Sequence, residues 1–144
     1  MNIELITSVD RLEGTLYFEF HPGAYGGNHW RTESVYLHLY VFDLVANVFV
    51  AEIPEFSYFG PTTISGRRVE KLAKALDEFA AAVNSAETPD AVWQPIEGNV
   101  HRGLIRPTGR LDHGQRAGEH QLRDLSRWLR GVAARSEPVS ILGI

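Results

Sequence analysis

The chain has 144 residues, of which 44% are hydrophobic and 22% charged, with a formal net charge of -4 at pH 7. This composition is typical of a folded domain, so we exclude wholesale disorder and expect residues 1–144 to form a single domain. The sequence has no cysteine, which excludes disulfides, thiolate zinc sites and cysteine nucleophiles. No apolar run reaches the ~20 residues of a membrane span, and residues 1–5 lack the basic start of a secretory signal. We therefore expect a cytoplasmic protein with no membrane contact.

Alternating strand patterns dominate the first third of the sequence. Thr15–Phe20 alternates apolar and polar residues, which predicts a half-buried strand with Glu19 facing outward. Ser34–Phe42 alternates with apolar or aromatic residues on both faces, which predicts the central strand of a sheet. Asp43–Asn47 reads as a hairpin connection. Val48–Ile53 is then predicted as the returning strand.

The segment His21–Trp30 separates the first two predicted strands. It holds three glycines, a proline and an asparagine, which are the residues typical of turns. It is longer than a usual hairpin loop, and long loops on rigid sheets often carry function. It also holds Tyr25 and Trp30, whose alternative role is to pack the loop down onto the sheet.

Helical periodicity dominates the second half. Apolar residues at three- and four-residue steps predict a helix over about 65–84, capped by Ser65 and packed on the aliphatic face of the central strand. Short strands are expected in 100–111, a second helix over about 118–134, and a last strand or docked end in 139–144. The second helix should bury Leu122, Leu125, Leu129 and Val132. Together these elements predict an α+β fold with a mainly antiparallel sheet, a helix on one face and a second helix near the C-terminus.

Charge is distributed unevenly along the chain. Residues 1–60 carry eight acidic and two basic side chains, whereas 101–135 carry eight arginines and three acidic side chains. Either the two halves complement each other within one domain, or one half presents a charged face to a partner. The arginine-rich second helix raises nucleic-acid binding as an alternative function. The acidic net charge and the helix's apolar stripe make a solvated basic face the preferred interpretation.

Few residues show the spacing of a catalytic or metal site. A two-histidine, one-carboxylate site from His21, His29 or His38 with Glu33 is the candidate, because imidazole and carboxylate are common metal ligands. The sequence has no H-E-x-x-H, His-x-His or EF-hand pattern, no G-x-S-x-G elbow and no phosphate loop. We therefore expect no cofactor and assign no catalytic residue. A small-molecule or metal-dependent enzyme using the His21–His38 region is kept as an alternative.

Three features resemble a known class of small proteins: the strand pair Ser34–Phe42 and Val48–Ile53, the helix Ser65–Asn84, and the acidic first 60 residues. In general style the chain is similar to the small α+β immunity proteins that accompany bacterial toxins. The resemblance implies a non-enzymatic inhibitor that plugs the active site of a toxin.

The leading functional hypothesis is protein binding without catalysis. Tyr25 and Trp30 are the expected aromatic anchors, and Glu19 and Glu33 form the expected acidic rim. An acidic rim favours a partner with a basic face, because complementary charge speeds encounter.

Overall fold

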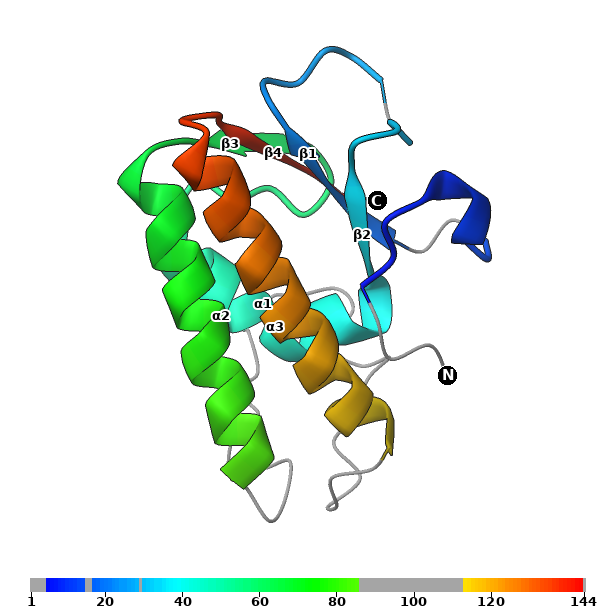
Figure 1. Ribbon diagram of the computed structural model, residues 1–144, viewed down its shortest axis with the longest axis vertical. Coiled ribbons are helices and arrows are strands. Elements are labelled where there is room, and N and C mark those ends of the chain that lie inside the picture. The colour runs from blue at the N-terminus through cyan, green and yellow to red at the C-terminus, as the bar shows by residue number, and fades with distance from the viewer. Residues whose placement is uncertain (1–4, 15–16, 29, 86–112, 144) are drawn as a thin grey trace.

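The computed structural model describes residues 5–14, 17–28, 30–85 and 113–143 (Figure 1). The strands are β1 (Tyr17–Pro22), β2 (Val35–His38), β3 (Pro61–Ile64) and β4 (Val139–Leu142). The helices are α1 (Leu39–Glu52), α2 (Arg67–Ser85), α3 (His113–Ala134) and the short 3-10 helix η1 (Val9–Arg11). The fold is mixed α+β with an antiparallel sheet, as the sequence predicted.

The sheet has the order β2-β1-β4-β3, and every neighbouring pair is antiparallel. Phe20 of β1 lies opposite Val35 on one side and Ile141 on the other. The two central strands are therefore β1 and β4, which come from opposite ends of the chain. The prediction of a last strand in 139–144 is confirmed.

The first strand, β1, is buried on both faces. Phe18 and Phe20 join the core shared with the helices, and the ring of Phe18 stacks on Phe42 of α1 with centroids 3.7 Å apart. Glu19 and His21 point to the opposite face, where they are also buried. The predicted alternation is confirmed, but the prediction of a half-buried strand is wrong, because the segment between β1 and β2 covers the second face.

The prediction of Ser34–Phe42 as the central strand is wrong in both length and position. Only Val35–His38 is a strand, and β2 lies at the edge of the sheet. The predicted hairpin over 43–47 and the strand Val48–Ile53 are also wrong, because α1 occupies Leu39–Glu52. The buried residues of this segment recur at helical steps, which overrides the strand preference of its β-branched and aromatic side chains: Phe42, Val45, Ala46, Phe49 and Ile53.

The two predicted amphipathic helices are confirmed as α2 and α3. They lie side by side and run in opposite directions (Figure 1). Ser126 of α3 donates a hydrogen bond of 2.9 Å to the carbonyl of Ala73, and both residues are buried. The apolar stripe of α2 therefore packs against α3 and α1, and its predicted packing on the central strand is wrong.

Helix α2 begins at Arg67, two residues after the predicted cap Ser65. The carbonyl of Ser65 accepts a bond from Arg68 N–H at 3.4 Å, and that of Gly66 accepts one from Val69 N–H at 3.2 Å. Gly66 has a φ of 61°, a left-handed conformation that glycine adopts without steric cost. The strands predicted in 100–111 lie outside the described residues. None of the described helices is long and apolar enough to cross a membrane.

The packing of α2 predicts that substitutions at two nearby positions, Leu76 and Lys74, differ strongly in their effect on stability. Leu76 is fully buried, so Leu76→Ala should lower the free energy of unfolding by ~2–5 kcal/mol through lost burial and a cavity. Lys74 is exposed and lies 4.0 Å from Glu78 in a solvated ion pair, so Lys74→Ala should change it by about 0.5 kcal/mol or less. Chemical denaturation of both variants measures the difference, and equal losses would show that the buried face is wrongly assigned.

Candidate functional site

The candidate site is the segment between β1 and β2, residues 23–34, which we call the β1–β2 loop. The carboxylate of Glu19 lies beneath it and is 1% exposed. Its oxygens accept hydrogen bonds from the backbone N–H of Trp30 at 2.6 Å and of Arg31 at 2.8 Å, and from the Ser34 hydroxyl at 2.6 Å. Glu19 therefore holds the loop from below, and its expected place on an exposed rim is wrong.

Trp30 has an unusual backbone conformation. Its φ is 59°, in the left-handed region that bulky side chains rarely adopt. The bond from its N–H to Glu19 holds this conformation in place. The indole ring stacks on Tyr36 of β2, with centroids 5.8 Å apart and an interplanar angle of 29°. Both the backbone and the ring of Trp30 are thus fixed by buried groups.

Tyr36 ties the loop a second time. Burial, together with the nearby Glu19 carboxylate, raises the pKa of Tyr36 to about 12, so its hydroxyl stays protonated at neutral pH. This hydroxyl donates a hydrogen bond of 2.8 Å to the carbonyl of Arg31. Arg31 is therefore held through its N–H by Glu19 and through its carbonyl by Tyr36.

The start of the loop is fastened to β4. The N–H of Gly23 donates to the carbonyl of Pro138 at 2.7 Å, and the Ser140 hydroxyl donates to the Gly23 carbonyl at 2.7 Å. Gly23 has a φ of 102°, which favours glycine at this position. The loop is thus anchored at both ends, and its lower side rests on the face of the sheet opposite the helices.

Ser34 and His21 lie beside Glu19, but the donors and acceptors of their hydrogen bonds are not those of a catalytic serine and its base. Ser34 donates its single hydroxyl proton to Glu19, and its oxygen lies 3.0 Å from His21 Nδ1. His21 must therefore donate to Ser34, whereas activation of a serine nucleophile requires the histidine to accept its proton. Ser34 is also 1% exposed. These three side chains hold the loop and do not form a nucleophilic site.

Ser34 was not among the predicted site residues. The signal was present in the strand pattern, because alternation places Ser34 on the same face as Tyr36. Tyr36 lies opposite Glu19 in the register between β1 and β2. The sequence alone does not give the register between β1 and β2, so it could not show that Tyr36 lies opposite Glu19.

The predicted metal ligands are not assembled by the described residues. His38 lies opposite Tyr17, four residues along β1 from His21, which separates the two histidines by ~13 Å along the strand. One ion cannot bridge that distance. No group of three or more possible metal ligands occurs in the described part of the chain, and His29 lies outside it.

The β1–β2 loop displays three of the predicted contact residues. Tyr25 and Trp30 are each 37% exposed, and Glu33 is exposed. Four large hydrophobic side chains are exposed among the described residues, and the other two are Val50 and Phe59. The loop therefore contributes two of the four large apolar side chains that are exposed in the described part of the chain.

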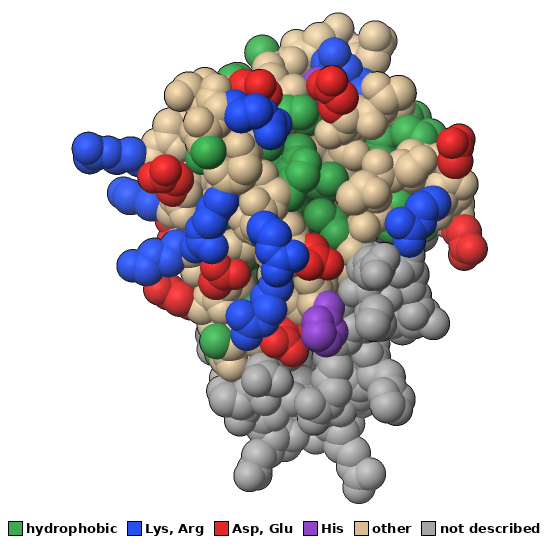
Figure 2. Space-filling model, in the orientation of Figure 1, with side chains coloured by type: hydrophobic (Ala, Val, Ile, Leu, Met, Phe, Trp, Pro, Cys, Tyr) green, Lys and Arg blue, Asp and Glu red, His purple; other side chains and the backbone are tan. Residues whose placement is uncertain are grey.

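The arginines of α3 whose side chains the structure describes do not form an uninterrupted basic stripe. Arg123 lies 2.8 Å from Glu119, and Arg130 lies 2.6 Å from Asp77 of α2. Acidic and basic side chains are intermixed over α2 and α3 (Figure 2). This mixed surface favours a solvated face over a nucleic-acid site, because phosphate backbones are bound by clustered, unneutralised cations.

No family model, curated protein or solved structure matches the chain.

Because Glu19 anchors the loop, we expect substitutions of Glu19 and of Glu33 to differ strongly in their effect on stability. Glu19→Gln replaces one acceptor oxygen with an NH2 group that faces backbone donors, so it should lower the free energy of unfolding by roughly 2–4 kcal/mol. Amide exchange at Trp30 and Arg31 should also become faster, because both N–H groups lose their acceptor. Glu33 is exposed, so Glu33→Gln should lower the free energy of unfolding by about 0.5 kcal/mol or less. Unchanged exchange in Glu19→Gln would contradict the anchoring role.

The buried His21 and the half-buried His38 predict a loss of stability in mild acid. Burial lowers the pKa of His21 below its ordinary value of 6.5, and Arg31 lowers it further, while three carboxylates oppose the shift: Glu19, Glu33 and Glu137. Burial also lowers the pKa of His38. The fold thus favours the neutral histidines, so their contribution is complete above pH 6.5 and is lost as the pH falls from 6.5 toward the lowered pKa values.

We therefore expect the free energy of unfolding to fall as the pH is lowered from about 7.5 to 5.5. The double variant His21→Gln/His38→Gln should lose part of this pH dependence. His120→Gln, at an exposed position on α3, should keep the wild-type slope. Denaturation at a series of pH values tests this, and an unchanged slope in the double variant would contradict it.

Proposed function

We propose that the chain is a non-catalytic protein-binding domain whose contact surface is the β1–β2 loop. The observation that carries the proposal is the conformation of Trp30, which is held at a φ of 59° by the buried Glu19 while 37% of the residue stays exposed. Strained backbone at a displayed aromatic residue is a frequent property of ligand-contacting loops.

The anchoring of the loop supports binding to a protein. A flexible loop loses conformational entropy when it binds, whereas a loop already fixed by Glu19, Tyr36 and Ser140 loses less. Tyrosine and tryptophan are enriched among the residues that dominate protein interfaces, because each buries a large area with few rotatable bonds. Tyr25 and Trp30 are the expected anchors.

The expected partner has a basic contact face. Glu33 is exposed on the loop, and the first 60 residues of the chain carry an excess of six acidic side chains. Such a charge would speed encounter with a basic surface. Toxins that bind nucleic acid present such a surface, so neutralisation of a toxin by a cognate immunity protein is the specific form of the proposal that the resemblance favours.

The contact surface can be tested by site-specific crosslinking in the cells that make the protein. A photoreactive phenylalanine analogue placed at Tyr25 should form a covalent adduct with the partner. The same analogue placed at Phe59 is the matched control, because Phe59 is more exposed, at 64%, and lies outside the loop. Adducts formed at Phe59 and not at Tyr25 would contradict the proposed surface.

Binding kinetics with the captured partner then test the anchors. Trp30→Ala should weaken binding by ~2 kcal/mol or more, mainly through faster dissociation. Glu33→Lys should instead slow association and reduce its dependence on salt. Phe59→Ala should bind as wild type does. Thermal denaturation of each variant confirms that the fold is retained, and wild-type kinetics in Trp30→Ala would refute its role as an anchor.

A further inference from the structure

A second surface lies away from the β1–β2 loop, between the N-terminal segment and α3. An open cleft of about 390 Å³ is lined by Leu5, Thr7, Arg11, Asp124, Arg127 and Trp128. Its volume is in the range of small-molecule sites, which is roughly 300–1,000 Å³. On the corresponding face of the molecule, hydrophobic side chains gather between α3 and the N-terminal segment, with charged side chains at the border (Figure 2). The cleft thus places the apolar side chains Leu5 and Trp128 beside three charged ones.

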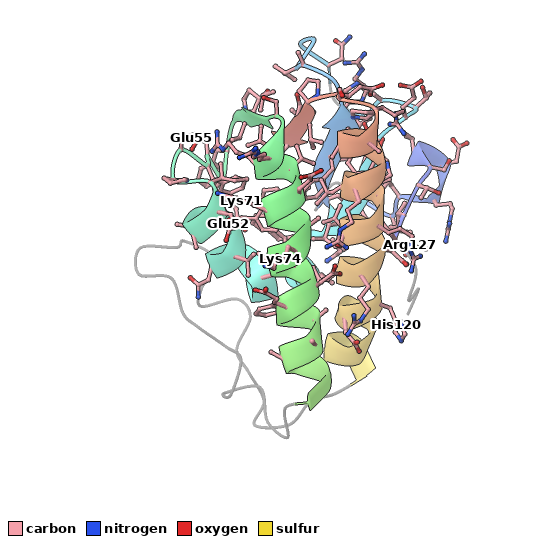
Figure 3. The ribbon with its side chains drawn as sticks, turned by 60° about the vertical axis from the view of Figure 1, so that its left-hand side comes forward. Glu52, Glu55, Lys71, Lys74, His120 and Arg127 are labelled. Carbon is pink, nitrogen blue, oxygen red and sulfur yellow. The ribbon has the colours of Figure 1, made fainter. Side chains whose placement is uncertain are left out.

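Two guanidinium groups reach the cleft from separate elements. Arg11 comes from η1, and Arg127 comes from the middle of α3, where it projects from the same side of the helix as His120 (Figure 3). Arg127 contacts Asp124 at 3.3 Å and its side chain is 81% exposed, so most of its donors still face solvent. None of the ion pairs in the described part of the chain involves Arg11. The lining therefore carries a net positive charge on a chain of net charge -4.

The number of guanidinium groups indicates the type of anion. A carboxylate carries one negative charge, which one guanidinium neutralises through two parallel hydrogen bonds. A phosphate monoester offers three terminal oxygens and up to two negative charges, so it can engage two guanidinium groups at once. Arg11 and Arg127 on one cleft therefore favour a phosphate over a carboxylate.

The interior of the cleft favours a flat ring attached to that phosphate. Trp128 is half-buried, packs against the core and lines the cleft beside the buried Leu5. An indole ring can stack on any nucleobase, because every base has a flat π-face. Asp124 adds an acceptor that can bind an amino or hydroxyl group of the ligand.

From these contacts we propose that the cleft binds a small phosphorylated ligand with a planar ring, such as a nucleoside monophosphate. Arg11 and Arg127 hold the phosphate, and Trp128 stacks on the ring. This site is separate from the proposed protein-binding loop, and neither proposal depends on the other.

Isothermal titration calorimetry with AMP, GMP, CMP and UMP tests the site directly. At least one should bind saturably with a Kd of about 1 mM or tighter. Two partial ligands serve as controls: ribose 5-phosphate lacks the ring, and the matching nucleoside lacks the phosphate. Each should bind at least about tenfold more weakly than the nucleotide. No binding by all four nucleotides, or equal binding by ribose 5-phosphate, would overturn the proposal.

Three variants identify the residues. Arg11→Gln and Arg127→Gln should each weaken nucleotide binding by about tenfold, as expected for one lost charge-assisted contact. Arg135→Gln is the matched control, because Arg135 is also an exposed arginine but does not line the cleft. Trp128→Phe should weaken binding of the nucleotide and leave that of ribose 5-phosphate unchanged. Wild-type affinity in both Arg11→Gln and Arg127→Gln would place the ligand elsewhere and refute this site.

Discussion

Strand β1 must be covered on both faces, and the rest of the structure follows from how the two faces are covered. Phe18 and Phe20 need apolar partners, which α1 provides with Phe42 and Phe49. Glu19, between them, brings a charge to the opposite face, and burying a carboxylate is costly unless hydrogen bonds replace its hydration. The backbone of the β1–β2 loop provides those bonds. One strand therefore determines both the position of the helices and the conformation of the loop.

The position of β4 makes the loop depend on the far end of the chain. This strand follows α3 in sequence, yet it lies between β1 and β3 in the sheet. Ser140 and Pro138 bind Gly23 at the start of the loop. Contacts of such high sequence separation form late and slow folding, because a long chain segment must be closed before they contribute. The final form of the loop therefore includes contacts that exist only when the C-terminal strand is in place beside β1.

Local patterns in the sequence predicted the helices and failed where two periods overlap. The stripe of α2 has a single period of 3.6 residues, and its prediction was correct. Between residues 35 and 53 a strand passes directly into a helix, and the alternation of Val35–His38 continues by chance to Phe42. Counting from Phe42 to Val45, Phe49 and Ile53 would have revealed the helix. Glu19 was correctly placed on the face opposite Phe18, but the sequence could not show that a loop covers it, because that contact depends on tertiary structure.

The two proposed surfaces rest on a common element. The carbonyl of Ile6 accepts a hydrogen bond of 2.8 Å from the N–H of Tyr36, whose ring supports Trp30. The neighbours of Ile6 in the chain, Leu5 and Thr7, line the cleft beside α3. The N-terminal segment thus contacts the support of the loop through its backbone and the cleft through its side chains. A ligand that shifts this segment would change the contacts beneath Trp30, and by thermodynamic linkage a partner bound at Trp30 would change the affinity of the cleft by the same factor. The hydrogen bond between Ile6 and Tyr36 is thus a direct contact through which the two proposed surfaces would be coupled.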